Sequence, residues 1–158
     1  MTKRFIFLCL LVFLCIAPAH SQSLIDDGRA AKGTPQLPTV LISGLDAYKT
    51  RGADEAIRLW LKDGPLEGNK DAAAQTDTLR QAEASYGPFQ YYEIILAREI
   101  SSRTQVFYLV FNYERGPLFA RFHVYRANHR WVLTDFLLSS REDAVLPPVQ
   151  YLPKSIEP

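Results

Sequence analysis

Cysteine is nearly absent from this sequence: only Cys9 and Cys15 occur among 158 residues, and both lie close to the N-terminus. The rest of the chain therefore has no disulfide and no metal site built on thiolate ligands. Histidine is scarce as well, with His123 and His129 as the only ones after His20. These two fall on different parts of the expected domain, with no carboxylate at ligand spacing. We predict neither a metal nor a cofactor.

The chain also lacks the short motifs of phosphate binding and of serine hydrolysis. It has no glycine-rich phosphate loop, and Ser101-Ser102 and Ser139-Ser140 stand outside any Gly-x-Ser-x-Gly context. The 18 basic residues form no cluster and are balanced by 17 acidic residues. Without an excess of positive charge there is no electrostatic footprint for nucleic acid or anionic lipid, so no nucleic-acid partner is predicted.

The N-terminus has the three parts of a secretory signal peptide. A basic start, Met1–Arg4, precedes the apolar run Phe5–Ile16 and the small-residue exit Ala17-Pro18-Ala19. The apolar run is too short for a membrane span, which needs about 20 residues. We predict a signal peptide over residues 1–19, with cleavage after residue 21 as the alternative. The protein is expected to be exported, to the periplasm or as a secreted protein, with no membrane span after cleavage.

Three helical patterns follow a flexible leader predicted over residues 22–38. Each has apolar residues at helical spacing and a glycine that ends it. Asn69 stands where it can cap the third helix, with Asp71 in the first turn. The expected helices and the residues that end them are 39–51 (Gly52), 53–62 (Gly64-Pro65) and 69–86 (Gly87-Pro88).

From residue 89 to residue 138 the composition becomes typical of strands, rich in Tyr, Phe, Val, Ile and Leu. Breaks at Ser101-Ser102, Arg115-Gly116 and Asn128-His129 predict an antiparallel meander of four strands. The fold class is therefore predicted to be α+β, with three N-terminal helices packed on this meander. The domain is expected over residues 39–140, followed by a proline-rich C-terminal arm over residues 141–158.

The strand register can be predicted if the three breaks are tight two-residue loops. Opposed residues in an antiparallel pair share a face, and a slip of one residue would move apolar side chains to the other face. With these loops, all three hairpins agree on one nearly all-apolar face, which the helices must cover. The expected pairs are Leu96–Phe107, Ile94–Leu109, Tyr92–Phe111, Tyr113–Leu118, Phe111–Ala120, Leu109–Phe122, Phe107–Val124, Arg126–Trp131, Val124–Leu133, Phe122–Asp135 and Ala120–Leu137.

The opposite face of the meander is mixed in character and unusually aromatic. Enrichment in Tyr and Arg among scattered apolar residues is typical of a protein interface, although aromatic residues are also common in strands for their β-propensity alone. The face is predicted to bind a protein partner or a second copy in a homodimer. The candidate interface residues are Tyr108, Phe119, Arg121, His123 and Tyr125.

The order of these elements resembles the nuclear-transport-factor-2-like (NTF2-like) superfamily, a cystatin-like α+β cone. The pattern Arg130-Trp131-Val132-Leu133-Thr134-Asp135-Phe136 looks like the closing strand of that family, and the resemblance spans about residues 38–140. It implies a curved sheet. The segments 86–89 and 112–117 also look like those of small exported bacterial proteins of unassigned function. The superfamily includes isomerases, cyclases and binding modules, so the fold does not choose among activities.

One carboxylate stands out as candidate chemistry. Asp135 is the only charged residue placed mid-strand on the apolar face, where burial would raise its pKa and suit it as a general base. Its structural alternative is a pair with Arg126 or a hydrogen bond to a Tyr hydroxyl or a Trp indole. The side chains expected to line a pocket around it are Trp60, Tyr92, Tyr113 and Trp131, each of which is also a natural core residue.

Because a lone carboxylate is weak evidence for an active site, the sequence favours a non-catalytic exported domain. Such a domain would bind a small apolar ligand inside the cone, or a protein partner through the opposite face. The alternative is an enzyme of the isomerase or cyclase type that uses Asp135 as its base.

Overall fold

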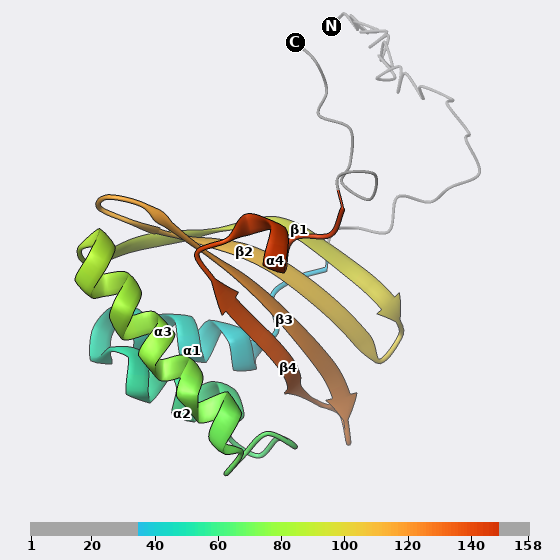
Figure 1. Ribbon diagram of the computed structural model, residues 1–158. Helices are drawn as coiled ribbons and strands as arrows, with labels where there is room; N and C mark the ends of the chain where they lie inside the picture. Colours follow the sequence, from blue (N-terminus) through green and yellow to red (C-terminus); the bar gives the residue numbers. More distant parts are fainter. Residues whose placement is uncertain (1–34, 149–158) are drawn as a thin grey trace, which may run out of the picture. The chain divides into compact units, whose positions relative to one another are not determined.

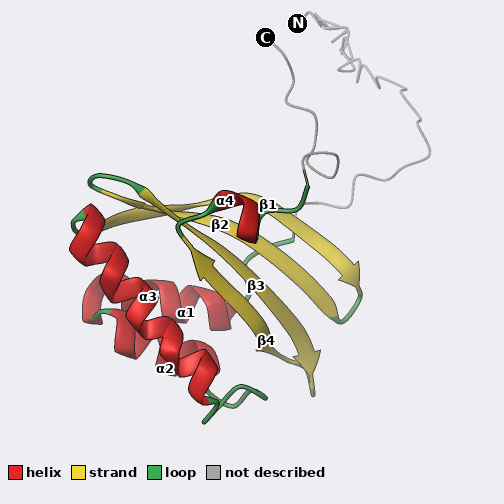
Figure 2. Cartoon of the chain, viewed as in Figure 1, coloured by secondary structure: helices red, strands yellow, loops and turns green. Residues whose placement is uncertain are grey.

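The computed structural model describes residues 35–148, so the predicted signal peptide, most of the leader and the last ten residues lie outside it. The predicted α+β class is confirmed: helices pack with a four-stranded antiparallel sheet (Figures 1 and 2). The helices are α1 (Thr39–Arg51), α2 (Ala53–Leu61), α3 (Lys70–Tyr86) and α4 (Glu142–Val145). The strands are β1 (Phe89–Ser101), β2 (Thr104–Tyr113), β3 (Pro117–Ala127) and β4 (Arg130–Ser139).

Local signals in the sequence account for where the helices begin and end. The Asn69 side chain accepts a hydrogen bond of 2.9 Å from the backbone N–H of Ala72, which caps α3. Gly52 separates α1 from α2 and has a φ of 87°, a conformation that favours glycine. Its N–H bonds the carbonyls of Ala47 and Tyr48, which closes the last turn of α1.

The four strands follow one another in the order β1-β2-β3-β4, so β1 and β4 are the edges. Helices α1, α2 and α3 lie on one side of the twisted sheet, called here the inner face, and α4 lies on the other, the outer face (Figure 1). The core between helices and inner face is aromatic at its centre. The Trp60 ring lies 4.9 Å from that of Phe122 and 6.4 Å from that of Phe111.

The first hairpin has the expected register only at one end. Tyr92 opposes Phe111 and Ile94 opposes Leu109, as predicted. A β-bulge between Ile94 and Leu96 then adds one residue to β1. The predicted pair Leu96–Phe107 is therefore wrong: Leu96 opposes Tyr108 and lies on the outer face, while Ala97 opposes Phe107.

The second hairpin is shifted by two residues from the expected register. Its turn is wider than the two-residue loop assumed, since Tyr113 N–H bonds the carbonyl of Gly116. Because the shift is even, the same side chains stay on the inner face. The predicted pairs Tyr113–Leu118, Phe111–Ala120, Leu109–Phe122 and Phe107–Val124 are replaced by Phe111–Leu118, Leu109–Ala120 and Phe107–Phe122.

The third hairpin has the register change that matters most for function. Arg126–Trp131 and Val124–Leu133 pair as predicted, but the register then shifts because β4 has one additional residue, Thr134. Every later residue of β4 changes face. The predicted pairs Phe122–Asp135 and Ala120–Leu137 are wrong, and the observed pairs are Phe122–Phe136, Ala120–Leu138 and His123–Asp135.

The segment after β4 also differs from the expected arm. Residues 142–145 form the short helix α4, and Val145 is buried against Val106 and Tyr108 of the outer face. The beginning of the segment 141–158 is therefore packed on the sheet. The part of that segment from residue 149 on lies outside the described residues.

Candidate functional site

The five residues expected to line a pocket inside the cone do not form one. Trp60 and Tyr113 are buried in the core, while Tyr92 and Trp131 are half-buried at its margin. Asp135 lies on the opposite side of the sheet. The interior that a small ligand would occupy is filled around Trp60 by the rings of Phe111, Phe122 and Phe136.

The Trp60 position is held by specific contacts as well as by packing. Its indole Nε1–H donates a hydrogen bond of 3.1 Å to the carbonyl of Leu41 in α1. Gly44, one turn further along α1, makes room for the ring, because a Cβ atom there would lie 2.0 Å from Nε1. The indole is therefore a fixed core element with its polar group satisfied, and it has no free donor for a ligand.

A buried pair of tyrosine hydroxyls is a feature that sequence reasoning missed. The hydroxyls of Tyr48 and Tyr113 lie 2.8 Å apart. Burial raises the pKa of both, and for Tyr48 the bond to Tyr113 raises the pKa further. Both hydroxyls are therefore neutral at physiological pH. One hydroxyl donates to the other, and the Tyr48 hydroxyl also lies 3.5 Å from the carbonyl oxygen of Leu79, to which it donates. With these partners inside the core, the evident role of the pair is structural.

Asp135 belongs to a polar cluster on the outer face, so its predicted placement as a buried base is wrong. Its carboxylate lies 3.3 Å from the Arg121 guanidinium, and 52% of its side chain is exposed. Its partner is Arg121 and not Arg126, because the bulge at Thr134 moves it to the outer face.

His123 lies directly opposite Asp135 in the sheet and completes this cluster. Partial burial lowers the pKa of His123, and the Arg121 charge adds to that, while Asp135 acts in the opposite direction. The imidazole is therefore biased toward its neutral form. No metal site accompanies it: within residues 35–148 no three His, Cys, Asp or Glu side chains group to hold an ion.

The aromatic outer face is only partly free, because α4 covers some of it. Val145 packs with Val106 and Tyr108 in a second small core that also includes Phe119 and Leu137 at its margin. Of the predicted interface residues, Tyr108 is thus buried within the chain and Phe119 is half-buried beside it. The remaining three are half-buried, namely Arg121, His123 and Tyr125.

The apolar surface that stays exposed is concentrated on the edge strand β1. Five large hydrophobic side chains are exposed within residues 35–148, and four of them are on this strand. The hairpin of β1 and β2 extends beyond the helices (Figure 2). Ile94 is 42% exposed although it opposes Leu109 on the inner face. The four residues are Tyr91, Ile94, Ile95 and Ile100.

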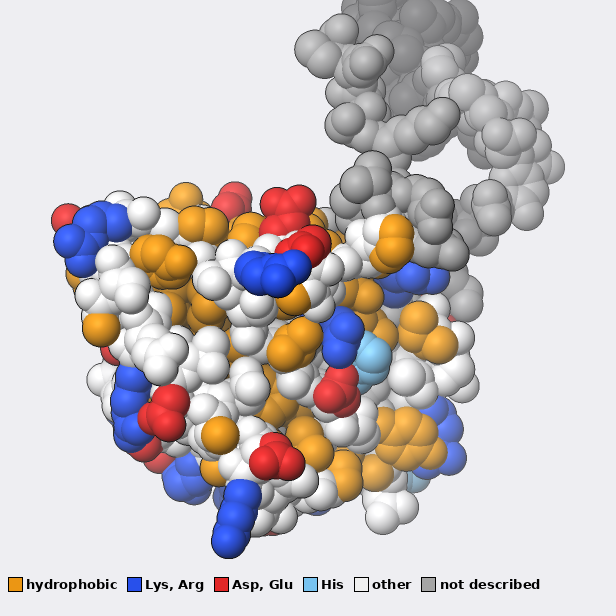
Figure 3. Space-filling model, viewed as in Figure 1, with side chains coloured by type: hydrophobic (Ala, Val, Ile, Leu, Met, Phe, Trp, Pro, Cys, Tyr) orange, Lys and Arg blue, Asp and Glu red, His pale blue; other side chains and the backbone are white. Residues whose placement is uncertain are grey.

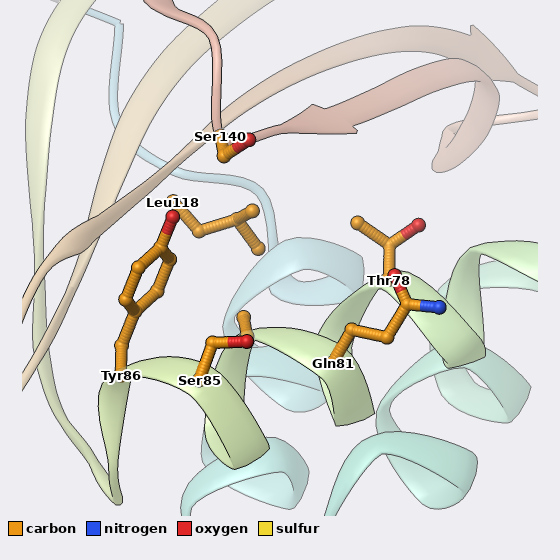
Figure 4. Close-up of a pocket in the computed structure, with 7 residues that line it drawn as sticks. Thr78, Gln81, Ser85, Tyr86, Leu118 and Ser140 are labelled. Atoms are coloured by element: carbon orange, nitrogen blue, oxygen red, sulfur yellow. The ribbon is translucent and has the colours of Figure 1, made fainter.

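The hollows of the surface lie at the margins of the domain. One, of about 140 Å³, lies between α3 and the end of β4, and Figure 4 shows its polar lining by Thr78, Gln81, Ser85, Tyr86 and Ser140. The lining offers hydroxyl and amide groups for hydrogen bonds, but no carboxylate, histidine or lysine to activate a hydroxyl as a nucleophile.

One charged hollow, of about 240 Å³, lies beside the start of α3 and includes Asp71 and Asp135. Two others carry charge as well. One of about 310 Å³ beside α1 has its Asp63 and Arg130 already paired with each other at 3.1 Å. The other lies at two strand turns and includes Arg103 and Arg126. Arg103 donates to the carbonyl of Arg126, so its guanidinium holds the two turns together. The face seen in Figure 3 mixes charges of both signs with small hydrophobic groups.

Comparison with known proteins identifies no relative of this chain. No family model, no curated protein and no solved structure matches it. None of the helices among residues 35–148 is long and apolar enough to cross a membrane.

Proposed function

We propose that this chain is an exported, non-catalytic domain with an NTF2-like fold that acts by binding a protein partner. The NTF2-like assignment is supported by the order of elements, helices first and a twisted antiparallel meander after them, with those helices on one face (Figure 1). The export assignment is supported by the N-terminal sequence pattern alone. Binding of a protein, not of a small molecule, is supported by how apolar side chains are distributed.

The observation that carries the proposal is the contrast between a filled interior and an exposed edge. A ligand pocket is normally a concave, largely apolar cavity with a few polar groups aimed into it. Here the place for such a cavity is occupied by Trp60, Phe111 and Phe122. Apolar side chains reach the surface on β1, which is an edge strand with no second strand neighbour among residues 35–148. An edge of this kind favours a protein as the occupant.

A photo-crosslinking experiment tests the proposal. The crosslinking amino acid p-benzoylphenylalanine replaces Tyr91 on β1 or Tyr125 on the outer face, and replaces Lys49 on the exposed side of α1 as the control. Irradiation in the producing cells is expected to give a discrete crosslinked protein from position 91, from position 125, or from both, and none from position 49.

A different pair of results would instead indicate that the chain binds a small molecule. If neither strand position gives a crosslink and the purified chain binds a hydrophobic dye saturably with a change in tryptophan fluorescence, protein binding is wrong. Trp60 reports on the interior directly, because it is the fully buried tryptophan at the centre of the core.

A further inference from the structure

Strand β1 carries two opposite charges that the bulge brings to the same face. In a regular strand residues 93 and 98 would point to opposite faces, because faces alternate. With the additional residue between Ile94 and Leu96, Glu93 opposes Val110 and Arg98 opposes Val106. Both charged side chains are therefore on the outer face. The Glu93 carboxylate is held there by a hydrogen bond of 2.9 Å from the Asn112 side chain.

We infer that β1 pairs antiparallel with β1 of a second copy, around a two-fold axis between Ile95 and Leu96. This rests on the proposed function and names its partner as the chain itself. In this register Glu93 of each copy faces Arg98 of the other, which makes two identical charge pairs. Opposed residues in an antiparallel pair share a face. Glu93 can therefore face Arg98 of the other copy only because the bulge places both residues on the outer face. The two four-stranded sheets become one continuous sheet.

The same register also brings exposed apolar side chains together. Tyr91 faces Ile100 of the other copy at both ends of the paired segment, and these are the two most exposed large hydrophobic residues of the described chain, at 57% and 56%. Ile95 faces Leu96 at the centre. A shift of two residues in either direction would place Arg98 opposite Tyr91 or Ile95 and remove both charge pairs. Charge complementarity therefore favours this register.

A two-fold symmetric contact uses one patch twice, so the patch must complement itself. Glu93 and Arg98 meet that requirement on a strand whose outward backbone groups have no strand neighbour among residues 35–148. If the partner were an unrelated strand, Glu93 and Arg98 would have no reason to be placed symmetrically about one point of β1. This symmetry is the reason for choosing a second copy as the occupant.

Charge reversal gives a test that separates self-pairing from other roles of β1. Glu93→Arg sets Arg against Arg98, and Arg98→Glu sets Glu against Glu93, so each single variant is expected to dimerise about tenfold more weakly than wild type or worse. A mixture of the two single variants is expected to form a heterodimer, because all four charges then pair. The double variant is expected to dimerise as wild type does. Arg115→Glu, in the turn after β2, is the control.

Cysteine pairing tests the register itself, because residues 16–158 have no cysteine. Opposed residues in an antiparallel pair have Cα atoms about 5 Å apart, within the range of a disulfide. Mixing Glu93→Cys with Arg98→Cys under mild oxidation is expected to give a covalent heterodimer. Each variant alone should give none, since equal positions lie about 17 Å apart along the strands.

The outcomes distinguish this inference from the broader proposal. A wild-type chain that stays monomeric in sedimentation velocity runs at high concentration overturns the dimer, as does a mixture of single variants that fails to associate. If position 91 then crosslinks to a different protein, self-pairing is wrong while protein binding stands. If it crosslinks to a product of twice the chain mass and the charge swap restores association, both stand.

Discussion

The hydroxyls of Tyr48 and Tyr113 illustrate how individual side chains set the chemistry of this core. A hydroxyl taken out of water costs free energy unless it finds a partner, and here two such groups meet at 2.8 Å. Burial raises the pKa of both. A tyrosine with a raised pKa in the folded state stabilises the fold fully below its unfolded pKa of about 10. That stability is lost as the pH rises above 10, because the unfolded chain then releases the proton first.

We therefore predict that Tyr113→Phe lowers the free energy of unfolding by about 1 kcal/mol at pH 7, since Tyr48 loses its closest hydrogen-bond partner. Above pH 10 the unfolding free energy of the wild type should fall by about 1.4 kcal/mol per pH unit for each of the two tyrosines. The variant has only one of these tyrosines, so its unfolding free energy should fall less steeply with pH. Urea titrations from pH 7 to pH 11 measure both effects. Tyr91→Phe, on an exposed side chain, is the control. Equal pH slopes for the variant and the wild type would contradict the assignment.

At the scale of elements, the additional residue in β4 determines which side chains enter the core. It places Phe136 on the inner face, where its ring stacks on Phe122 at 6.1 Å with an interplanar angle of 3°. It places Asp135 on the outer face, paired with Arg121. A regular strand would have reversed the two. An aromatic side chain in the core contributes several kcal/mol, while an exposed ion pair contributes at most about 1 kcal/mol.

Phe136→Ala is accordingly expected to lower the free energy of unfolding by about 3–5 kcal/mol, from lost packing and a remaining cavity. Asp135→Ala should change it by no more than about 1 kcal/mol, because the Arg121 pair is exposed to solvent. Chemical denaturation of the two variants under the same conditions compares these neighbours directly. A larger loss for Asp135→Ala than for Phe136→Ala would show that the register of β4 is not the one described.

At the scale of the whole molecule, the two cysteines and the predicted export signal occupy the same stretch. Cys9 and Cys15 both precede Ala19. Removal of the signal would therefore leave a chain with no thiol, whose stability in an oxidising compartment rests on packing without disulfides. The core around Trp60 is consistent with that requirement, since a chain of about 140 residues buries enough surface to fold without such links.

We predict that the full chain, produced in a bacterium, is recovered outside the cytoplasm without its first 19 or 21 residues. Intact-mass measurement reads the cleavage site, and a thiol assay of the denatured product should detect no cysteine. Ala19→Arg should block processing, because signal peptidase requires small residues there. Ala30→Arg is the control with the same change in charge. Recovery of the unprocessed chain from the cytoplasm would show that the N-terminal segment is not an export signal.

Much of the fold could be predicted because its signals are local. Asn69 as a cap and Gly52 as a break act within one helical turn, and the turn at Asn128-His129 is marked by two adjacent residues that adopt positive φ. The inner faces of β2 and β3 were also predicted correctly, while Leu96, Asp135 and Leu137 were assigned to the inner face wrongly. An even shift, as in the second hairpin, keeps every side chain on its face.

The candidate site could not be predicted in the same way, because it depends on contacts between segments far apart in the sequence. Of the register shifts in the sheet, the two that matter here, between Ile94 and Leu96 and at Thr134, have no clear mark in the sequence, since each depends on how two strands pack against the core. One bulge removed Asp135 from the interior and placed it beside Arg121. The other placed Glu93 and Arg98 on one face of an exposed edge.

The sequence by itself determined which segments are helices and strands and which residues are apolar enough to be buried, since period and propensity are local. Only the tertiary structure decided which face each functional side chain occupies, because a single additional residue inverts a strand and its cause lies across the sheet.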